Sequence, residues 1–360
     1  MPSPPLTQIP SHVVALEDYE ALARTHVNEA AWAYISGGSA DERTLRENHA
    51  AFERLKLLPR VLGDFTGANT AVSLLGRTLP HPVIIAPTAF HRLMHPDGEL
   101  ATVLGAAAME ACTVVSTSAT VLLEDLATAA KGPLWFQLYM QPDSDHTLDL
   151  IRRAELAGYE ALVVTVDAPV NGLRNREQRA NFQLPPGLEP VNLRGRPALP
   201  MCESVFDPAY IAHLPQWQHL VWLREHTKLP ILLKGILAAD DAARALDAGV
   251  EGLIVSNHGG RTLDGAPASI EALPRVAERV SGQVPVIVDG GIRRGTDVLK
   301  ALALGADAVM VGRPILHGLA VAGPVGVAHV LKILRTELEI AMLLCGCPTR
   351  ESITKEVLWG

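Results

Sequence analysis

The sequence predicts an α/β protein folded as a (β/α)8 TIM barrel, with an N-terminal helical cap and a long loop after the fourth strand. From residue 81 onward, eight short apolar runs alternate with amphipathic segments of helical type. The cores of the runs are almost continuously apolar, which is typical of parallel strands covered on both faces. Eight βα units in a row favour a closed barrel, with a doubly wound open sheet as the structural alternative.

The predicted strands and helices follow in a regular order. The eight strands fall within residues 81–90, 112–118, 134–140, 161–167, 230–236, 252–258, 284–292 and 306–314. Helical patterns between them include 97–111, 145–158, 239–249 and 296–305. Gly158, Gly249 and Gly305 end three of these patterns, at positions where a helix C-cap is expected.

Two stretches lie outside the repeat. Residues 1–75 precede the first strand and show helical patterns around 16–35 and 41–51, which predicts a cap packed on the barrel. Residues 168–215 are rich in Pro, Arg, Asn and Gly, and loops this long are usually lids or partly disordered segments. We therefore treat 1–360 as a single domain, with a cap at 1–75 and the barrel at 76–360.

Composition excludes some functions. The net charge of −8 argues against a non-specific nucleic-acid binder, which needs a basic surface. No apolar run reaches the ~18 residues of a membrane span, and the start MPSPPLTQIPSHVV lacks the pattern of a signal peptide. The four cysteines include a Cys345-Gly-Cys347 pair, which could bind metal or form a strained disulfide, but reduced thiols are the simpler reading. We expect a cytoplasmic protein without a membrane anchor.

Histidine spacing gives no metal prediction. His91 and His95 have the spacing of two metal ligands on a helix, but this spacing alone does not establish a metal site. We therefore expect supporting or surface roles for them and no metal site.

Polar or Gly-containing sequence follows all eight predicted strands. TIM barrels carry their active-site groups at the C-terminal ends of the strands, so these residues predict one polar chamber over an apolar barrel. In strand order they are Pro87, Thr88 and Ala89; Ser116; Gln137 and Tyr139; Thr165 and Asp167; Lys234; Ser256 and His258; Asp289, Gly290 and Gly291; and Gly312 and Arg313.

The last two strands end in a phosphate-binding pattern. DGGIRRGTD (289–297) and GRP (312–314) are Gly-rich turns that lead toward helices, so their backbone N–H groups could hold a phosphate. TIM barrels commonly bind phosphate after strands 7 and 8. No G-x-G-x-x-G follows the first strand, which favours a mononucleotide or a phosphosugar over NAD.

These motifs resemble those of the FMN-dependent 2-hydroxy acid oxidases and dehydrogenases, the group of glycolate oxidase, lactate oxidase and mandelate dehydrogenase. The resemblance covers nearly the whole chain, and the combination of SNHGGR with DGGIRRG is its most specific part. The motifs are AYISGG (33–38), APTAF (86–90), WFQLY (135–139), TVDAP (165–169), LKG (233–235), SNHGGR (256–261), DGGIRRG (289–295) and GRP (312–314).

The resemblance implies catalytic and substrate-binding roles. His258 would be the catalytic base, and Asp167 would stabilise its imidazolium form. Arg261 and Arg174 would bind the substrate carboxylate, as planar and permanently charged groups can. Further roles are carried over for Tyr34 (substrate carboxylate), Tyr139 (substrate hydroxyl) and Lys234 (flavin N1 and O2).

The resemblance also implies FMN as the cofactor. The flavin ring and ribityl chain would contact Pro87, Thr88, Ala89, Ser116, Gln137, Thr165, Ser256 and Asp289. The phosphate would be held by Arg293, Gly312 and Arg313, next to the turn at Gly290 and Gly291.

The expected reaction is oxidation of an L-2-hydroxy acid to a 2-keto acid. Ser118 stands where the glycolate oxidase branch typically has tryptophan, so we expect a roomier pocket for lactate or larger acids, aromatic ones included. O₂ is the expected acceptor, and a dehydrogenase that uses a quinone or cytochrome is the alternative. Another FMN or phosphosugar barrel enzyme (an isomerase or lyase) and a non-catalytic barrel are remote alternatives. Relatives suggest a homotetramer.

Overall fold

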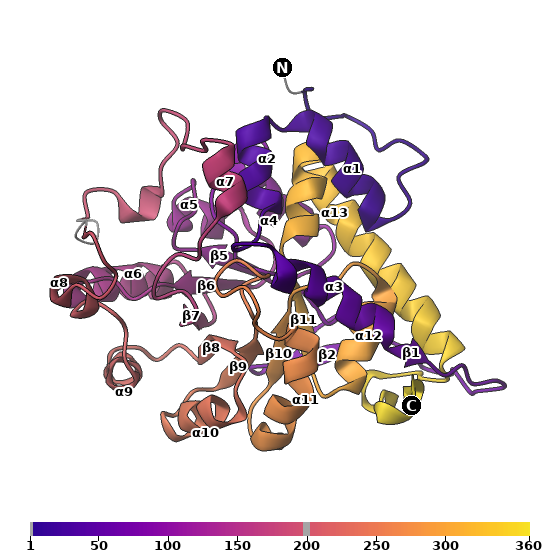
Figure 1. Cartoon of the computed structure of the whole chain (residues 1–360). Helices are drawn as coiled ribbons and strands as arrows, with labels where there is room; N and C mark the ends of the chain where they lie inside the picture. Colours follow the sequence, from indigo (N-terminus) through magenta and orange to yellow (C-terminus); the bar gives the residue numbers. More distant parts are fainter. Residues whose placement is uncertain (1–2, 197–201) are drawn as a thin grey trace.

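Eight parallel strands close into a barrel in the computed structural model, which describes residues 3–196 and 202–360 (Figure 1). The strands pair in chain order, and β11 pairs with β4 to close the barrel. The predicted TIM barrel is therefore confirmed, and the open-sheet alternative is wrong. The strands are β4 (Val83–Ile85), β5 (Thr113–Ser116), β6 (Leu134–Leu138), β7 (Leu162–Thr165), β8 (Ile231–Ile236), β9 (Gly252–Val255), β10 (Val286–Asp289) and β11 (Ala308–Val311).

A helix follows each strand and covers the outside of the barrel (Figure 1). Gly158, Gly249 and Gly305 adopt positive φ just after α6, α10 and α12, as the C-cap prediction requires. The helices are α4 (Glu99–Ala107), α5 (Leu123–Ala129), α6 (Ser144–Leu156), α9 (Trp217–His226), α10 (Ala239–Asp247), α11 (Ser269–Val280), α12 (Gly295–Ala303) and α13 (Arg313–Leu344).

The barrel interior is an apolar plug. Successive side chains of a strand face opposite sides, so one residue in two points inward. A separate buried cluster collects these inward residues, among them Ile84, Val114, Trp135, Val163, Leu232, Ile254, Ile287 and Met310. The plug fills the barrel up to the C-terminal ends of the strands, and those ends carry polar groups.

The N-terminal cap consists of α1 (Leu16–His26), α2 (Glu29–Ser36) and α3 (Arg43–Arg54). The helical pattern expected at 16–35 is divided in two, because the Asn28 side chain accepts the backbone N–H of Ala31 and starts α2. Helix α1 packs on α13, and α3 packs on α11. Asn48 of α3 and Asn257 exchange two side-chain hydrogen bonds of 2.9 and 2.7 Å, which tie the cap to the end of β9.

Two small sheets flank the barrel. Strand β1 (Lys56–Leu57) pairs with β12 (Leu358–Trp359) and so ties the segment after α3 to the C-terminal residues. Strands β2 (Val72–Leu74) and β3 (Arg77–Leu79) form a hairpin whose apolar residues pack with the barrel plug. The cap boundary expected at residue 75 falls inside this hairpin, because the hairpin is built by pairing that the helical pattern did not reveal.

The long loop after β7 contains short helices. These are α7 (Asn175–Arg179), a 3-10 turn at Val191–Leu193 and α8 (Pro208–Ile211). Helix α7 lies beside α2 of the cap (Figure 1). The part of the loop at 197–201 lies outside the described residues.

Helix α13 has the length and composition of a membrane span, which the search for apolar runs did not find. Its mean hydropathy reaches 1.5, and 78% of the corresponding window is buried within the protein. Residues Ala322 and Gly323 leave the helical conformation and kink it. Helices α4, α1 and α12 cover most of its apolar side chains.

Candidate active site

Strand alternation places a ring of polar side chains directly above the apolar plug. Two positions after the inward-facing plug residues stand Ser116, Gln137, Thr165, Lys234, Ser256 and Asp289, which therefore face the same interior. A cavity of about 1180 Å³ opens above them. All the sequence-predicted site residues line this cavity except Ser256 and Asp167, which lie behind Lys234 and His258 and are bonded to them.

His258 and Asp167 form a hydrogen-bonded pair. The His258 Nδ1 lies 2.8 Å from Asp167 Oδ1. Burial lowers the pKa of His258, against the raising effect of Asp167. Burial acts to raise the pKa of Asp167, but the charge of Lys234 and the hydrogen bond from His258 hold it below its usual value. The pair is therefore an ionised carboxylate beside a neutral imidazole whose Nε2 is free to accept a proton.

Lys234 places a buried positive charge at the barrel centre. Its Nζ lies 3.1 Å from Asp289 Oδ2 and donates to Ser256 Oγ at 2.9 Å. Burial acts to lower the pKa of Lys234, but Asp289 and Asp167 raise it above its usual value. The ammonium group therefore stays charged and can stabilise negative charge in the cavity.

Three buried polar atoms of the ring lack hydrogen-bond partners within the described chain. They are Gln137 Nε2, Thr165 Oγ1 and Asp289 Oδ1. A buried polar group without a partner costs about 1–3 kcal/mol, so such atoms at a cavity indicate a polar ligand. A donor, a hydroxyl and an acceptor suit the polar edge of a flavin ring and the hydroxyls of a ribityl chain.

The other end of the cavity suits a phosphate. Arg313 donates to the carbonyls of Ile35, Gly259 and Gly37 at 2.8–3.0 Å, so its hydrogen-bond partners are all neutral. Burial, together with Arg261 and Arg293, lowers the pKa of Arg313 to about 9. Burial also lowers the pKa of Arg293, whose ion-pair partner in α1 is 3.7 Å away. Two partly buried cations beside Gly-rich turns and the start of α13 favour a bound dianion.

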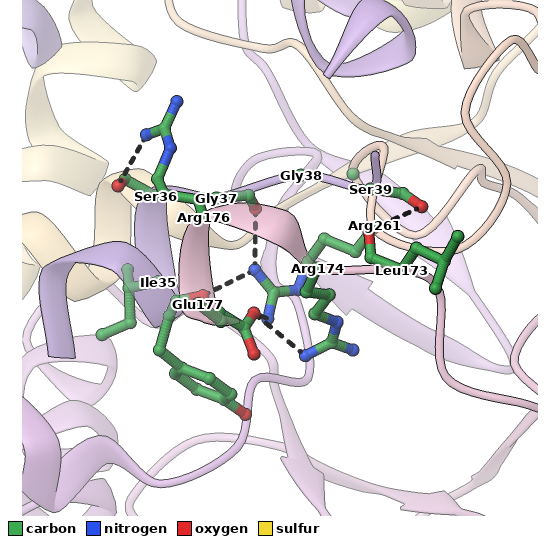
Figure 2. A network of polar contacts seen from close by, with 12 residues as sticks. Ile35, Ser36, Gly37, Gly38, Ser39, Leu173, Arg174, Arg176, Glu177 and Arg261 are labelled. Carbon is green, nitrogen blue, oxygen red and sulfur yellow. Dashed lines mark hydrogen bonds and ion pairs between the residues drawn. The ribbon is translucent and has the colours of Figure 1, made fainter. Parts of the chain in front are cut away.

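Two more arginines form a second cationic group at the cavity, joined by an acidic residue (Figure 2). Arg261 Nη1 donates to the carbonyls of Tyr34 and Gly37 at 2.7 and 2.8 Å, and its Nη2 donates to Glu177 Oε1 at 3.1 Å. Arg174 Nη1 donates to the same oxygen at 3.3 Å. The Arg261 guanidinium also lies 5.1 Å from the Tyr34 ring centroid. We call Arg174, Arg261 and Tyr34 the carboxylate clamp.

The chain matches the FMN-dependent dehydrogenase family over residues 23–360. It belongs to that family. It is 46% identical to an L-lactate oxidase of Nostoc over 97% of this chain and 98% of the relative. It is 45% identical to a peroxisomal (S)-2-hydroxy-acid oxidase of Oryza sativa, covering 95% of this chain and 94% of the relative. A solved mandelate oxidase structure matches with a TM-score of 0.88 and 43% identity over 96% of this chain and 98% of that one.

Membership of the FMN-dependent dehydrogenase family identifies the cofactor as FMN. The residues fit it. The unpartnered atoms of Gln137, Thr165 and Asp289 line one part of the cavity, and Arg293 and Arg313 line another. The individual cofactor contacts stay predictions.

Sequence reasoning missed three groups at this site. Glu177 bridges the clamp arginines, and its signal was its place three residues after Arg174, one turn along a helix. Phe182 stacks on Tyr34 with ring centroids 4.6 Å apart. Leu193 and Leu214 also line the cavity. These residues belong to the long loop, whose irregular composition gave no periodic pattern to interpret.

Proposed function

We propose that this enzyme oxidises an L-2-hydroxy acid to the 2-keto acid and passes the electrons to O₂, which becomes H₂O₂. The observation that carries the proposal is the convergence of a neutral, carboxylate-paired His258 and two arginines on one cavity. A carboxylate binds to arginines and a hydroxyl gives its proton to a base, and a 2-hydroxy acid carries both groups on adjacent carbons. The substrate loses two electrons and two protons, and O₂ gains them.

The chain's own groups divide the work. The clamp binds the substrate carboxylate and so fixes the neighbouring carbinol carbon. His258 Nε2 accepts the hydroxyl proton, and Asp167 stabilises the resulting imidazolium. Burial raises the pKa of Tyr139 to about 12, so its phenol stays protonated and can donate a hydrogen bond to the substrate oxygen. Bound FMN supplies the two-electron acceptor, and Lys234 stabilises negative charge that develops beside it. The same residues serve hydride and carbanion descriptions of the C–H step.

The relatives support O₂ as the acceptor. The named relatives are L-lactate oxidases, (S)-2-hydroxy-acid oxidases and a mandelate oxidase. A dehydrogenase that uses a quinone or cytochrome would share the same substrate site and differ only in reoxidation. An isomerase or lyase would have no use for the His258 base and the paired arginines together.

The cavity supports lactate or a larger acid as the substrate. Ser118 lines it with a small side chain, and Phe90, Met140, Leu193 and Leu214 supply apolar walls. An apolar wall beside a carboxylate clamp favours acids with an alkyl or aryl group. The proposed substrates are L-lactate and L-2-hydroxy acids with bulkier side chains, mandelate included.

The test is anaerobic mixing of the FMN-loaded enzyme with a panel of L-2-hydroxy acids. Flavin absorbance should bleach with lactate or larger acids, and air should restore it with one H₂O₂ per flavin. Bleaching without recovery in air, but with recovery on adding a quinone, would indicate a dehydrogenase. A panel in which glycolate has the highest kcat/KM would contradict the assignment of substrate size, and no bleaching by any acid would contradict the function.

We further propose a cytoplasmic homotetramer without a membrane anchor. The four cysteines are free thiols, and Cys112, Cys345 and Cys347 are buried, which suits a reducing compartment. Val61, Leu62, Leu344 and Trp359 are exposed large apolar side chains, as expected where copies associate. Light scattering of the purified enzyme should give four times the chain mass, and a monomer mass would contradict the proposal.

A further inference from the structure

Glu177 lies between the two arginines of the carboxylate clamp. Its Oε1 accepts from Arg261 Nη2 at 3.1 Å and from Arg174 Nη1 at 3.3 Å (Figure 2). The side chains of Glu177 and Arg261 are each 14% exposed, and that of Arg174 is 18% exposed. We propose that Glu177 is a positioning residue that holds both guanidinium groups in the arrangement that receives the substrate carboxylate. The inference rests on the proposed function for the identity of that carboxylate.

The hydrogen bonds of Arg261 show what Glu177 leaves free. A guanidinium has five N–H donors. Both Nη1 donors go to backbone carbonyls of the cap, and one Nη2 donor goes to Glu177. The Nε–H and the second Nη2–H have no partner among the described residues, so they remain available for a carboxylate. Glu177 therefore takes one donor of Arg261 and leaves two for the substrate.

Arg174 depends on Glu177 more strongly. It precedes α7 in the long loop and is not part of a barrel strand. Its Nη1 bonds Glu177, while its buried Nε–H has no partner within the described chain. A buried donor without an acceptor beside the cavity indicates the place of an anion. Because two guanidinium groups repel each other, the shared Glu177 oxygen is what keeps Arg174 close to Arg261.

The segment that carries Glu177 is anchored independently of it. Leu173 O accepts the Ala40 N–H at 2.5 Å. Arg176 Nη1 donates to Ser36 Oγ at 3.1 Å (Figure 2). Arg176 also pairs with Glu42 of the cap. A change at Glu177 should therefore leave α7 in place and disturb only the clamp. Glu189 is the matched control, because it is an acid of the same loop that pairs with Arg194 and with neither clamp arginine.

Charge and positioning predict opposite effects. Arg174, Arg261 and Glu177 together carry one net positive charge. By charge alone, neutralising Glu177 raises this to two and should tighten the binding of an anion. If Glu177 positions the arginines, its removal should weaken binding, because the guanidinium groups must then be ordered when the ligand arrives. The proposal requires the second result.

The experiment titrates pyruvate, a 2-keto acid with no hydroxyl to oxidise, into the FMN-loaded enzyme and follows flavin absorbance. Glu177→Gln should raise the Kd of pyruvate about tenfold, while Glu189→Gln leaves it unchanged. Glu177→Asp keeps the charge and shortens the reach, so it should also weaken binding. The FMN content and Tm of each variant show whether it is folded. If Glu177→Gln does not fold, the pyruvate Kd of Glu177→Asp tests the proposal instead.

A double-mutant cycle shows whether Glu177 acts through Arg174. The effect of Glu177→Gln on the Kd should shrink when Arg174→Met is already present. In Glu177→Gln the limiting rate of anaerobic flavin reduction by L-lactate should change less than the Kd does. The reason is that a disordered clamp weakens ground-state binding of the substrate more than it slows the chemical step. Pyruvate binding in Glu177→Gln that is equal to or tighter than in the wild type would overturn the proposal. So would a fold-change in Kd from Glu177→Gln that is the same with and without Arg174→Met. If the wild type binds pyruvate but no hydroxy acid reduces its flavin, the proposed function fails. The role of Glu177 in pyruvate binding is still measured in that case.

Discussion

His258, the proposed base, adopts a left-handed backbone conformation. Its φ is 57°, and Gly259 and Gly260 follow with φ of 63° and 73°. For a non-glycine residue this conformation costs about 1–2 kcal/mol. The His258 N–H donates to Ser256 Oγ at 3.0 Å and its ring bonds Asp167, which offset the strain and aim the imidazole into the cavity. Backbone strain compensated in this way is typical of catalytic positions.

His258→Asn is the sharpest test of the base. Asparagine tolerates positive φ better than most residues, so the turn and the FMN site should survive. It cannot accept the hydroxyl proton, and flavin reduction by L-lactate should slow by about 10²–10⁴-fold. Stopped-flow absorbance measures the reduction, and the flavin content of the purified variant is the control. Rapid bleaching of a flavin-replete variant would show that another group is the base.

The pH dependence of kcat/KM should report the same residue. Only neutral His258 accepts a proton, so the rate should fall as pH falls through its pKa. Burial, followed by the nearby charges of Lys234 and Arg261, lowers this pKa below the usual 6.5, while Asp167 raises it. The acid limb should therefore have its midpoint below 6.5 in the wild type. Asp167→Asn removes the raising charge and should move the limb to lower pH, whereas an unmoved limb would contradict the assignment.

The positions of site residues were predictable where motif and strand position agreed. His258 and Asp289 stand at or just after strand ends, and the structure brings them to one cavity. Glu177 was missed because its importance comes from meeting Arg261 across 84 positions of sequence. No local pattern encodes such a contact, and only the packing of the loop on the cap creates it.

At the scale of elements, the contact between α3 and the loop after β10 fixes the cap on the barrel. Gly291 has a φ of 87°, and a Cβ built there would lie 2.0 Å from the carbonyl oxygen of Asn48. Gly282 is a matched comparison, because its φ is 74° and a Cβ would meet nothing within 4 Å. The two positions therefore separate backbone strain from steric overlap.

Gly291→Ala should lower the free energy of unfolding more than Gly282→Ala does. The conformational term is about 1–2 kcal/mol at both sites, and overlap with α3 should add roughly 1–3 kcal/mol at Gly291. Denaturant unfolding followed by circular dichroism measures the difference. Because the overlap lies at the turn after Asp289, FMN content should also fall in Gly291→Ala and stay normal in Gly282→Ala. Equal losses of stability at both sites would contradict this prediction, because they would mean that α3 moves to admit the Cβ at Gly291 without an energetic penalty.

Elements with strong periodicity were predicted well, and irregular ones were not. The eight apolar runs became the eight barrel strands because parallel strands need apolar residues on both faces. The hairpin β2–β3 and the kink at Ala322 depend on pairing and packing with distant segments. Three residues per strand are too few to give a period, which explains why the boundary at residue 75 cut the hairpin.

For the whole molecule, one cavity joins the cap, the barrel and the long loop. Tyr34 comes from the cap, Lys234 from a strand and Phe182 from the loop, and all three line it. The closed barrel could be predicted because it repeats one unit eight times. The closure of cap and loop over its mouth could not, because those contacts involve segments without a repeat.

Cofactor binding should therefore stabilise the whole fold, and the phosphate should supply much of the effect. A ligand at 100 times its Kd adds about 2.7 kcal/mol to the free energy of unfolding, or a Tm increase on the order of 5 °C. FMN should give this shift in apoenzyme, and riboflavin at the same concentration a smaller one, because it leaves the partly buried charges of Arg293 and Arg313 without their anion. Arg293→Met should reduce the FMN shift toward that of riboflavin and leave the riboflavin shift unchanged. Differential scanning fluorimetry measures all four combinations, and equal shifts for FMN and riboflavin in the wild type would exclude these arginines as the phosphate site.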